Sequence, residues 1–256
     1  MKPKKLYTAI SIALWLLIWF IAAYFIGHNI FLPSPIMVFK AFGELFSSQN
    51  FYISILTSLR GILIGLVIGF ALGILLGWLS YINSFIQAFI GVFIKAIKSI
   101  PIASFVILAL LWFSSKSLSI LISSLIVMPI IYSNFLGALN ETNVKMLEFA
   151  KVFRLTPLQK IRYIYMPATI SPLISGAKVA IGYAWKSGVA AEIIGLIRFT
   201  IGNELYKAKL YLDTPKLFAW TITIILLSFI CEKIIIGLLT LLRKYIGGQN
   251  NVNNNN

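Results

Sequence analysis

The amino-acid sequence predicts an all-α membrane protein with about six transmembrane helices and a short cytoplasmic helix between the fourth and the fifth. The composition is the first reason: 59% of the residues are hydrophobic, 11% are charged, and the mean hydropathy is +0.92. Soluble domains carry about 25% charged residues, so water could not be the solvent for the whole chain. The second reason is a series of apolar runs that match the roughly 20 residues needed to cross a bilayer.

The apolar runs give the order of the predicted spans. They cover residues 6–27, 53–79, 85–113, 117–139, 168–197 and 216–242. Lysines interrupt the third and fifth runs, but both remain long enough to be spans. The first run is longer than the core of a signal peptide, which has about 7–15 residues, and no small-residue cleavage site follows it. It is therefore predicted to be a retained anchor helix.

Three regions follow from this order. Residues 1–52 hold an N-terminal cytoplasmic tip, the first span and an outer loop, and residues 53–246 hold a core of five spans. Gly247-Gly248 is expected to break the chain. Residues 247–256 are predicted to form a disordered Asn-rich tail, because almost none of their side chains gains from burial.

The charge distribution gives the orientation. The net charge of +15 comes from 22 Lys and Arg against 7 Asp and Glu, and the basic residues gather at the ends of the apolar runs. This placement indicates contact with anionic lipid and argues against nucleic acid as a partner. With the N-terminus inside, the cytoplasmic segments hold ten basic residues, and the outer segments hold six when Lys216 at the start of the last span is included. Both termini are therefore predicted to be cytoplasmic.

The longest polar stretch between spans, residues 141–167, lies on the cytoplasmic side in this orientation. Its pattern predicts a helix over 142–153 and a second helical piece that ends at Pro167. Thr156 is a suitable N-cap with Pro157 at the first helical position. The sequence therefore predicts a helical hairpin at the membrane surface that serves as a docking surface, with a merely solvated linker as the alternative.

Two spans carry stripes of small residues. The second span has glycines at four-residue spacing: Gly61, Gly65, Gly69, Gly73 and Gly77. The fifth has a similar stripe: Gly176, Ala180, Ala184 and Gly188. Four-residue spacing keeps such residues on one side of a helix, where another backbone can approach closely. Both stripes are interpreted as packing faces.

Ionisable residues within spans are candidates for function, because their burial in lipid is costly. The candidates are Lys95, Lys98, Lys178, Lys186 and Glu192. The lysines either line a path or extend to the membrane surface. Lys95 and Lys98 precede Pro101, where a kink would free backbone groups to line a cavity. Glu192 continues the small-residue stripe of the fifth span and is expected to meet a hydrogen-bond donor from a neighbouring helix or a second copy of the chain.

Signatures of enzymes and metal sites are missing from the sequence. Cys231 and His28 are the only residues of their types, so no His- or Cys-based metal site is expected. Lys186-Ser187 could end a phosphate-binding loop, but Ala180 and Trp185 stand where that loop needs glycine. The chain is therefore not expected to be an enzyme or to bind ATP, and an ATP-driven transporter would need its motor on another polypeptide.

The cytoplasmic segment Glu148-Phe149-Ala150, followed by Ile164 and Pro167, resembles the EAA loop of permease subunits in ABC importers. The family pattern is Glu-Ala-Ala, then Gly six residues after the Glu, then Ile-x-x-Pro with the Pro nineteen residues after the Glu. Four residues are in register: Glu148, Ala150, Ile164 and Pro167. Phe149 replaces an Ala, and Arg154 replaces the Gly that makes a sharp turn in the family.

Other motifs are similar to the nitrate/sulfonate/taurine branch of these permeases, and together they cover residues 30–242. They are Leu32-Pro-Ser-Pro35, Ser99-Ile-Pro101, Leu111-Trp-Phe113, Ala184-Trp185, Val189-Ala-Ala-Glu192, Leu212-Asp-Thr-Pro215 and Phe218-Ala219. The resemblance implies a multi-pass permease of the bacterial inner membrane that moves a small anion, a sulfonate-like solute or a heterocycle. It also implies a homodimer, two ATPase subunits that bind ATP and Mg and grip the EAA loops, and an extracellular binding protein.

Two other classes stay open. A secondary transporter driven by an ion gradient would favour several acidic residues within the spans, whereas the spans hold few, and Glu192 is the candidate among them. A membrane scaffold that transports nothing would not require that glutamate. The candidate pathway or gating residues are Lys95, Lys98, Pro101, Trp185, Lys186 and Glu192, and the candidate coupling residues are Glu148, Phe149, Ala150, Arg154, Ile164 and Pro167.

Overall fold

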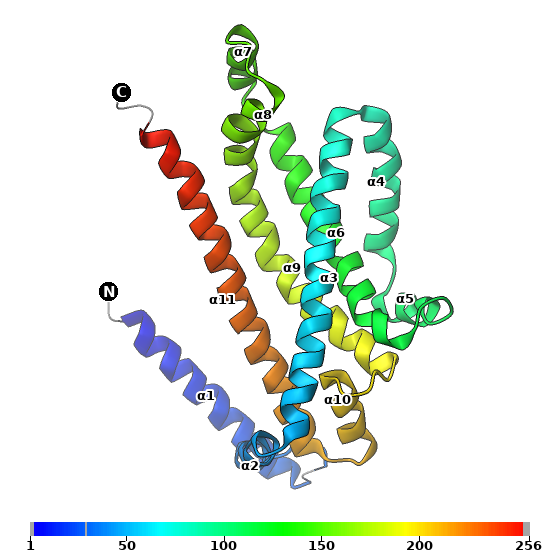
Figure 1. Ribbon diagram of the computed structural model, residues 1–256. Helices are drawn as coiled ribbons and strands as arrows, with labels where there is room; N and C mark the ends of the chain where they lie inside the picture. The colour runs from blue at the N-terminus through cyan, green and yellow to red at the C-terminus, as the bar shows by residue number, and fades with distance from the viewer. Residues whose placement is uncertain (1–2, 29, 253–256) are drawn as a thin grey trace. The chain divides into compact units, whose positions relative to one another are not determined.

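The computed structural model describes residues 3–28 and 30–252, and within them it contains helices and no strands (Figure 1). The elements are α1 (Pro3–Ile26), α2 (Pro35–Phe46), α3 (Gln49–Ile82), α4 (Ser84–Ser99), α5 (Ile102–Ala109), α6 (Ser115–Asn140), α7 (Val144–Val152), α8 (Pro157–Lys160), the π-helical turn η1 (Ile161–Tyr165), α9 (Met166–Ile194), α10 (Ile201–Leu210) and α11 (Thr214–Val252). The predicted all-α class is confirmed.

Five helical stretches of the described chain are long and apolar enough to cross a membrane: Leu6–Ile26, Gln49–Ile82, Ser115–Asn140, Pro157–Ile194 and Thr214–Lys244. A sixth crossing exists if α4 and α5 act as one span. The prediction of an all-α membrane protein with about six spans therefore agrees with the structure, which gives five or six candidates.

The predicted third span, residues 85–113, is not one helix. It consists of α4 and α5, which are bent by 103° at the break between them, and α5 ends at Ala109. The cause lies at Ile100 and Pro101, which are both in extended conformation. The ring of a proline disfavours helical geometry in the residue before it, so the first helix ends there.

The chain divides into two compact units. The first consists of Met1–Ser58 and Leu196–Leu226, and the second of Leu59–Gly195 and Leu227–Asn256. Both are discontinuous in sequence, whereas the sequence pattern divides the chain at 52/53 and at 246/247. The two divisions differ because the units are defined by contacts between segments that are distant in sequence, and the order of apolar runs does not predict such contacts.

Aromatic packing organises the first unit. The rings of Phe51 and Trp220 are 5.1 Å apart and both side chains are buried. Trp19 stacks on Phe218 at 5.7 Å, and its Nε1 donates a hydrogen bond to the carbonyl of Pro33 at 3.1 Å. These contacts join α1, the residues before α2, α3 and α11 within one unit.

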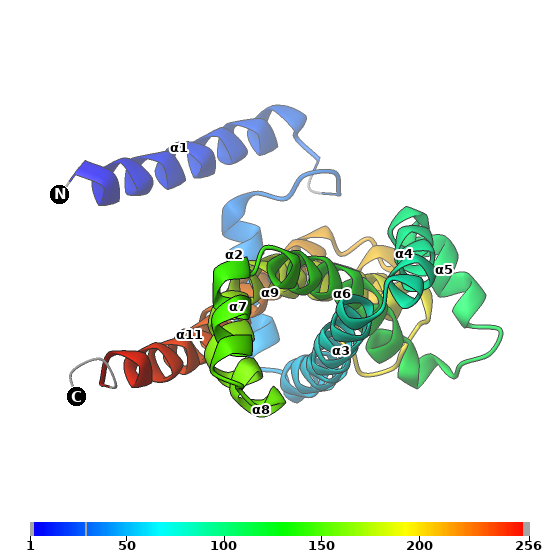
Figure 2. The same cartoon turned by 90° about the horizontal axis from the view of Figure 1, so that it is seen from above.

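Helices α3, α6 and α9 form the centre of the second unit, where they lie side by side (Figure 2). The long contact between α6 and α9 is the main one. Helix α4 packs on α6 through Ile90 and Ile94, which meet Met128, Tyr132 and Leu136. Helices α7 and α8 lie beyond the ends of α6 and α9 (Figure 1).

The end of the chain differs from the expectation drawn from Gly247-Gly248. Helix α11 runs through both glycines to Val252, and residues 253–256 lie outside the described residues. Glycine within a helix costs about 1 kcal/mol relative to alanine, which weakens a helix without ending it.

Candidate functional site

The loop that resembles the EAA loop begins with α7. The predicted helix over 142–153 is present as Val144–Val152, and Asn143 caps it by accepting a hydrogen bond from the amide of Lys145 at 3.0 Å. Thr156 caps α8 as predicted. Its amide donates to Gln159 Oε1 at 2.8 Å, and the amide of Gln159 donates to Thr156 Oγ1 at 3.4 Å. These reciprocal bonds form a capping box.

The second half of this loop does not end at Pro167. Helix α8 continues through η1 into α9, so the loop runs into the membrane-spanning helix without a break. Pro167 lies at the second position of α9, directly after the widened π-helical turn. A proline in a regular α-helix clashes with the carbonyl four residues earlier, and the wider turn relieves this conflict.

Arg154 makes the sharp turn for which the family pattern has glycine. Its φ is 50°, in the left-handed region. The amide of Leu155 donates to the carbonyl of Ala150 at 2.9 Å, and the amide of Arg154 donates to that of Lys151 at 3.1 Å. These two bonds form a Schellman motif at the end of α7. The turn therefore persists although the glycine does not.

We expect Arg154→Gly to stabilise the protein by roughly 1 kcal/mol, because a left-handed conformation costs a non-glycine residue about 1–2 kcal/mol. Arg154→Val should lower stability, since a β-branched residue fits this region poorly. Thermal unfolding of the purified protein in detergent measures both changes. A lower midpoint for Arg154→Gly would show that the arginine side chain itself holds the turn.

Some of the predicted coupling residues are buried in the fold, and others lie on the surface of the loop. Ala150, at 1% exposure, and Ile164 are buried in the fold. Glu148 is exposed and Phe149 is 51% exposed, and the ring of Phe149 lies 4.2 Å from that of the exposed Phe153. Other apolar residues exposed on α7 and α8 are Val144, Met146, Val152 and Leu158. Together with Phe149 and Phe153 they form the loop patch.

The five glycines of α3 face α6, as their spacing predicts. At Gly65 and Gly69 an added Cβ would lie 2.6 Å from a backbone oxygen of α6, and at Gly73 it would lie 2.7 Å from a side-chain carbon. Gly61 and Gly77 leave slightly more room, with nearest atoms at 3.1 and 2.9 Å. The two backbones could not approach this closely if α3 carried side chains here.

Glu192 lies where α3, α6 and α9 meet. Its side chain is 0% exposed, and Ser119 Oγ of α6 donates a hydrogen bond to Glu192 Oε1 at 3.5 Å. An added Cβ at Gly61 would lie 3.1 Å from the same Ser119 Oγ. One turn away along α6, Ser123 Oγ donates to the carbonyl of Ala184 at 3.2 Å. The donor expected for Glu192 is thus Ser119, and the carboxylate does not extend to the membrane surface.

The other pathway candidates do not converge on Glu192. Lys98 Nζ donates to Ser133 Oγ at 2.8 Å, and Lys186 lies over the ring of Tyr183 at 5.6 Å from its centre. Both lysines are exposed, as are Lys95, Lys178 and Pro101. Trp185, in contrast, is buried and hydrogen-bonds to Cys231. In this conformation the lysines and Pro101 lie on the surface of the chain, whereas Trp185 is part of the core.

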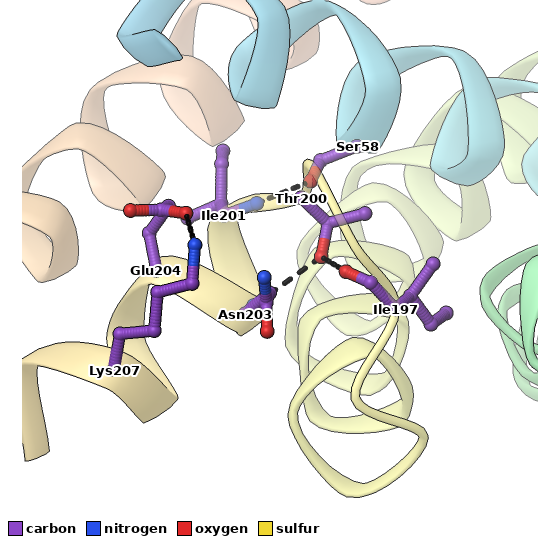
Figure 3. A network of polar contacts seen from close by, with 7 residues as sticks. All are labelled: Ser58, Ile197, Thr200, Ile201, Asn203, Glu204 and Lys207. Atoms are coloured by element: carbon purple, nitrogen blue, oxygen red, sulfur yellow. Dashed lines mark hydrogen bonds and ion pairs between the residues drawn. The ribbon is translucent and has the colours of Figure 1, made fainter. Parts of the chain in front are cut away.

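A polar network at the start of α10 was not apparent from the sequence (Figure 3). Thr200 Oγ1 donates to the carbonyl of Ile197 at 2.7 Å and accepts from the amide of Asn203 at 3.2 Å. The amide of Ile201 donates to Ser58 Oγ of α3 at 2.9 Å. Thr200 before a short helix is a recognisable N-cap signal, but its link to Ser58 depends on the tertiary fold.

Charged residues surround a hollow of about 430 Å³ in the first unit. Two ion pairs line it, Lys207 with Glu204 at 2.7 Å (Figure 3) and Lys216 with Asp213 at 2.8 Å. Glu44, from the end of α2, adds a third carboxylate. These residues come from three separate segments, so sequence spacing gave no signal of the hollow.

Comparison of the sequence with known proteins identifies the family to which the chain belongs. Residues 69–243 match the model of the inner membrane component of binding-protein-dependent transport systems. SsuC of Bacillus subtilis, named for the transport of aliphatic sulfonates, is 23% identical over 189 residues, which are 73% of this chain and 68% of SsuC. A Brucella melitensis protein named as an ABC transporter permease is 29% identical over 72 residues, or 28% of this chain and 29% of that protein.

The matched region covers more than half of the chain and contains the loop at 141–167, the glycine face of α3 from Gly69 onward, and Glu192. The similarity to SsuC agrees with the resemblance to the nitrate/sulfonate/taurine branch. The chain belongs to the inner-membrane permease family of binding-protein-dependent ABC importers.

Proposed function

We propose that this chain pairs with a second copy to form the translocation path of an ABC importer for a small anion, a sulfonate-like solute or a heterocyclic solute. Support for a sulfonate-like solute comes from SsuC, whose name assigns it to aliphatic sulfonates. The exposed amino groups of Lys95, Lys98 and Lys186 would suit an anionic solute along the path. The alternative remains a secondary transporter driven by an ion gradient.

The proposed assembly has three kinds of partner beside the lipid bilayer. Two ATPase subunits bind ATP and Mg on the cytoplasmic side, and an extracellular binding protein delivers the solute. With both termini cytoplasmic, α10 and the turn after α2 lie on the outer side. The hollow lined by Glu44 and the two ion pairs then offers charges of both signs to the binding protein.

The loop patch is the observation that carries this proposal. It places Phe149, Phe153 and four other apolar side chains on the surface of a loop that connects two spans, α6 and α9. Exposed apolar groups of this kind mark protein interfaces, and aromatic residues are enriched at interface centres. Docking of the ATPase on this patch would connect ATP hydrolysis to the helices that form the path.

Phe149→Ser is expected to reduce co-purification of the ATPase by at least about tenfold, since loss of a central aromatic residue costs about 2 kcal/mol or more of binding free energy. The permease itself should still accumulate in the membrane, because the side chain is half exposed. Ala150→Arg would be a poorer test. Ala150 is buried, so a large side chain there would disturb the loop itself.

The matched control is Tyr211→Ser, which removes an exposed ring after α10. It should leave ATPase binding unchanged. Equal co-purification with Phe149→Ser and with the unmodified chain would contradict the docking assignment. ATP-dependent uptake in proteoliposomes containing the complex then tests the whole proposal. Uptake that follows an imposed ion gradient and ignores ATP would favour the secondary transporter.

The distribution of acidic residues also helps to distinguish an ATP-driven importer from a secondary transporter. Two acidic residues lie within candidate spans of the described chain, Glu192 and Glu232, and of these only Glu192 is buried. Carriers driven by protons or cations commonly use several intramembrane carboxylates. A single buried glutamate that accepts a hydrogen bond from Ser119 is better suited to holding helices together than to a proton relay.

A further inference from the structure

The π-helical turn η1 joins the cytoplasmic loop to the spanning helix α9. All of Lys160, Ile161, Tyr165 and Met166 have right-handed helical dihedral angles, and the amide of Met166 donates to the carbonyl of Ile161, five residues earlier. The turn therefore holds one more residue than an α-helical turn. Such turns are rare, are among the places where helices kink, and are frequent at functional positions.

The side chain of Thr169 bonds back to the residues at the junction of the turn and α9. Thr169 Oγ1 donates to the carbonyl of Tyr165 at 2.8 Å and lies 3.4 Å from that of Met166. The side chain of Ile164 is buried, whereas Ile161 and Tyr163 are exposed. The turn is thus joined to the first residues of α9, and one of its faces is buried while the other is exposed.

Tyr165 ties this turn to the end of α3. Its ring meets the ring of Trp78 edge-on at 5.3 Å and that of Tyr81 at 5.6 Å, and the Tyr81 hydroxyl lies 3.5 Å from the Tyr165 hydroxyl. The same end of α3 is joined to α6, because the Tyr132 hydroxyl donates to Ser80 Oγ at 3.1 Å. Through Tyr165, the first turn of α9 is held to α3 and, beyond it, to α6.

We propose that Tyr165 is a positioning residue for coupling: it prevents η1 from bending, so that a displacement of α7 and α8 moves α3, α6 and α9 together. A helix with a π-helical turn can kink there when one end is pushed, and the movement is then absorbed. Clamping the ring between Trp78 and Tyr81 removes that freedom. This inference rests on the proposed docking of an ATPase at the loop patch, but it concerns a different surface.

The test uses the assembled complex with Tyr165→Ala. We expect the ATPase to co-purify and to hydrolyse ATP at a rate within about twofold of the unmodified complex, while uptake per ATP hydrolysed falls about tenfold, a typical size for a coupling between sites. Amide hydrogen exchange should rise in residues 161–169 and stay unchanged in the middle of α6. Tyr165→Phe keeps the ring packing and should retain most of the coupling.

Tyr7→Ala, which removes an exposed ring of α1, is the control and should leave the ratio of uptake to hydrolysis unchanged. Parallel loss of hydrolysis and uptake in Tyr165→Ala would overturn the inference, since it would show a role in assembly alone. A normal ratio would overturn it as well. If the unmodified chain fails to bind an ATPase, the proposed function itself is wrong, and that result is visible before any variant is made.

Discussion

Gly69→Ala is expected to lower the free energy of unfolding by about 3 kcal/mol, at the upper end of the usual cost of overpacking. The added Cβ would lie 2.6 Å from the backbone oxygen of Ser124 and 2.7 Å from the Cβ of Val127. A backbone oxygen within a helix cannot rotate away, so α3 and α6 would have to separate. Gly69→Leu should prevent accumulation of folded protein altogether. Yield and thermal unfolding in detergent measure both effects.

Gly91→Ala provides the matched control, because a Cβ at this position of α4 would meet nothing within 4 Å. Alanine has the higher helix propensity, so this change should raise stability by up to about 1 kcal/mol. Leu72→Ala, on an exposed face of α3, should have a small effect. Equal destabilisation by Gly69→Ala and Gly91→Ala would show that close packing of α3 on α6 does not hold the fold together.

The sequence was most informative where a periodic pattern has a single structural meaning. Five glycines at four-residue spacing define one side of a helix, and α3 does approach α6 along that side. The N-cap at Thr156 was likewise readable, because Thr followed by Pro at the first helical position is a local signal. Composition, together with apolar runs of about 20 residues, was sufficient to predict an all-α membrane protein.

Predictions were incomplete or wrong where local signals have more than one structural outcome. Pro101 indicated a kink, and the chain does bend there, but the bend of 103° divides the predicted span into two helices. Pro167 indicated a helix end, whereas the preceding turn widens and the helix continues. The presence of a proline alone does not predict either outcome. The packing of neighbouring helices decides whether the helix bends, ends, or forms a wider turn at the proline.

The candidate site was predictable in part for the same reason. Glu192 stands out in sequence as a carboxylate within a span, but its donor, Ser119, is 73 positions earlier in the chain. Serine is common in membrane helices and carries no signal of its own. The hollow beside Glu44 and the clamp around Tyr165 also depend on distant segments, which a single sequence does not bring together.

Glu192→Gln is expected to slow transport by about tenfold or more while raising the thermal stability of the permease. The glutamine keeps the shape of the side chain and can still accept the hydrogen bond from Ser119 Oγ. Burying a carboxylate is more costly than burying an amide, so the change favours the conformation in which residue 192 is 0% exposed. If transport requires a second conformation in which Glu192 meets water, the variant will populate it less.

Ser119→Ala removes the other partner of the same hydrogen bond, and it is expected to lower stability, whereas Glu192→Gln is expected to raise it. It removes a donor and leaves the buried carboxylate less well satisfied, which typically costs about 1–3 kcal/mol, so stability should fall. In the double variant Ser119→Ala/Glu192→Gln, the loss caused by Ser119→Ala should be smaller than in the single variant, because the amide needs the donor less. Uptake and unfolding of all four proteins are measured in the same lipid. If Glu192→Gln transports and unfolds like the unmodified chain, the negative charge is dispensable and Glu192 serves only to fill space between α3, α6 and α9.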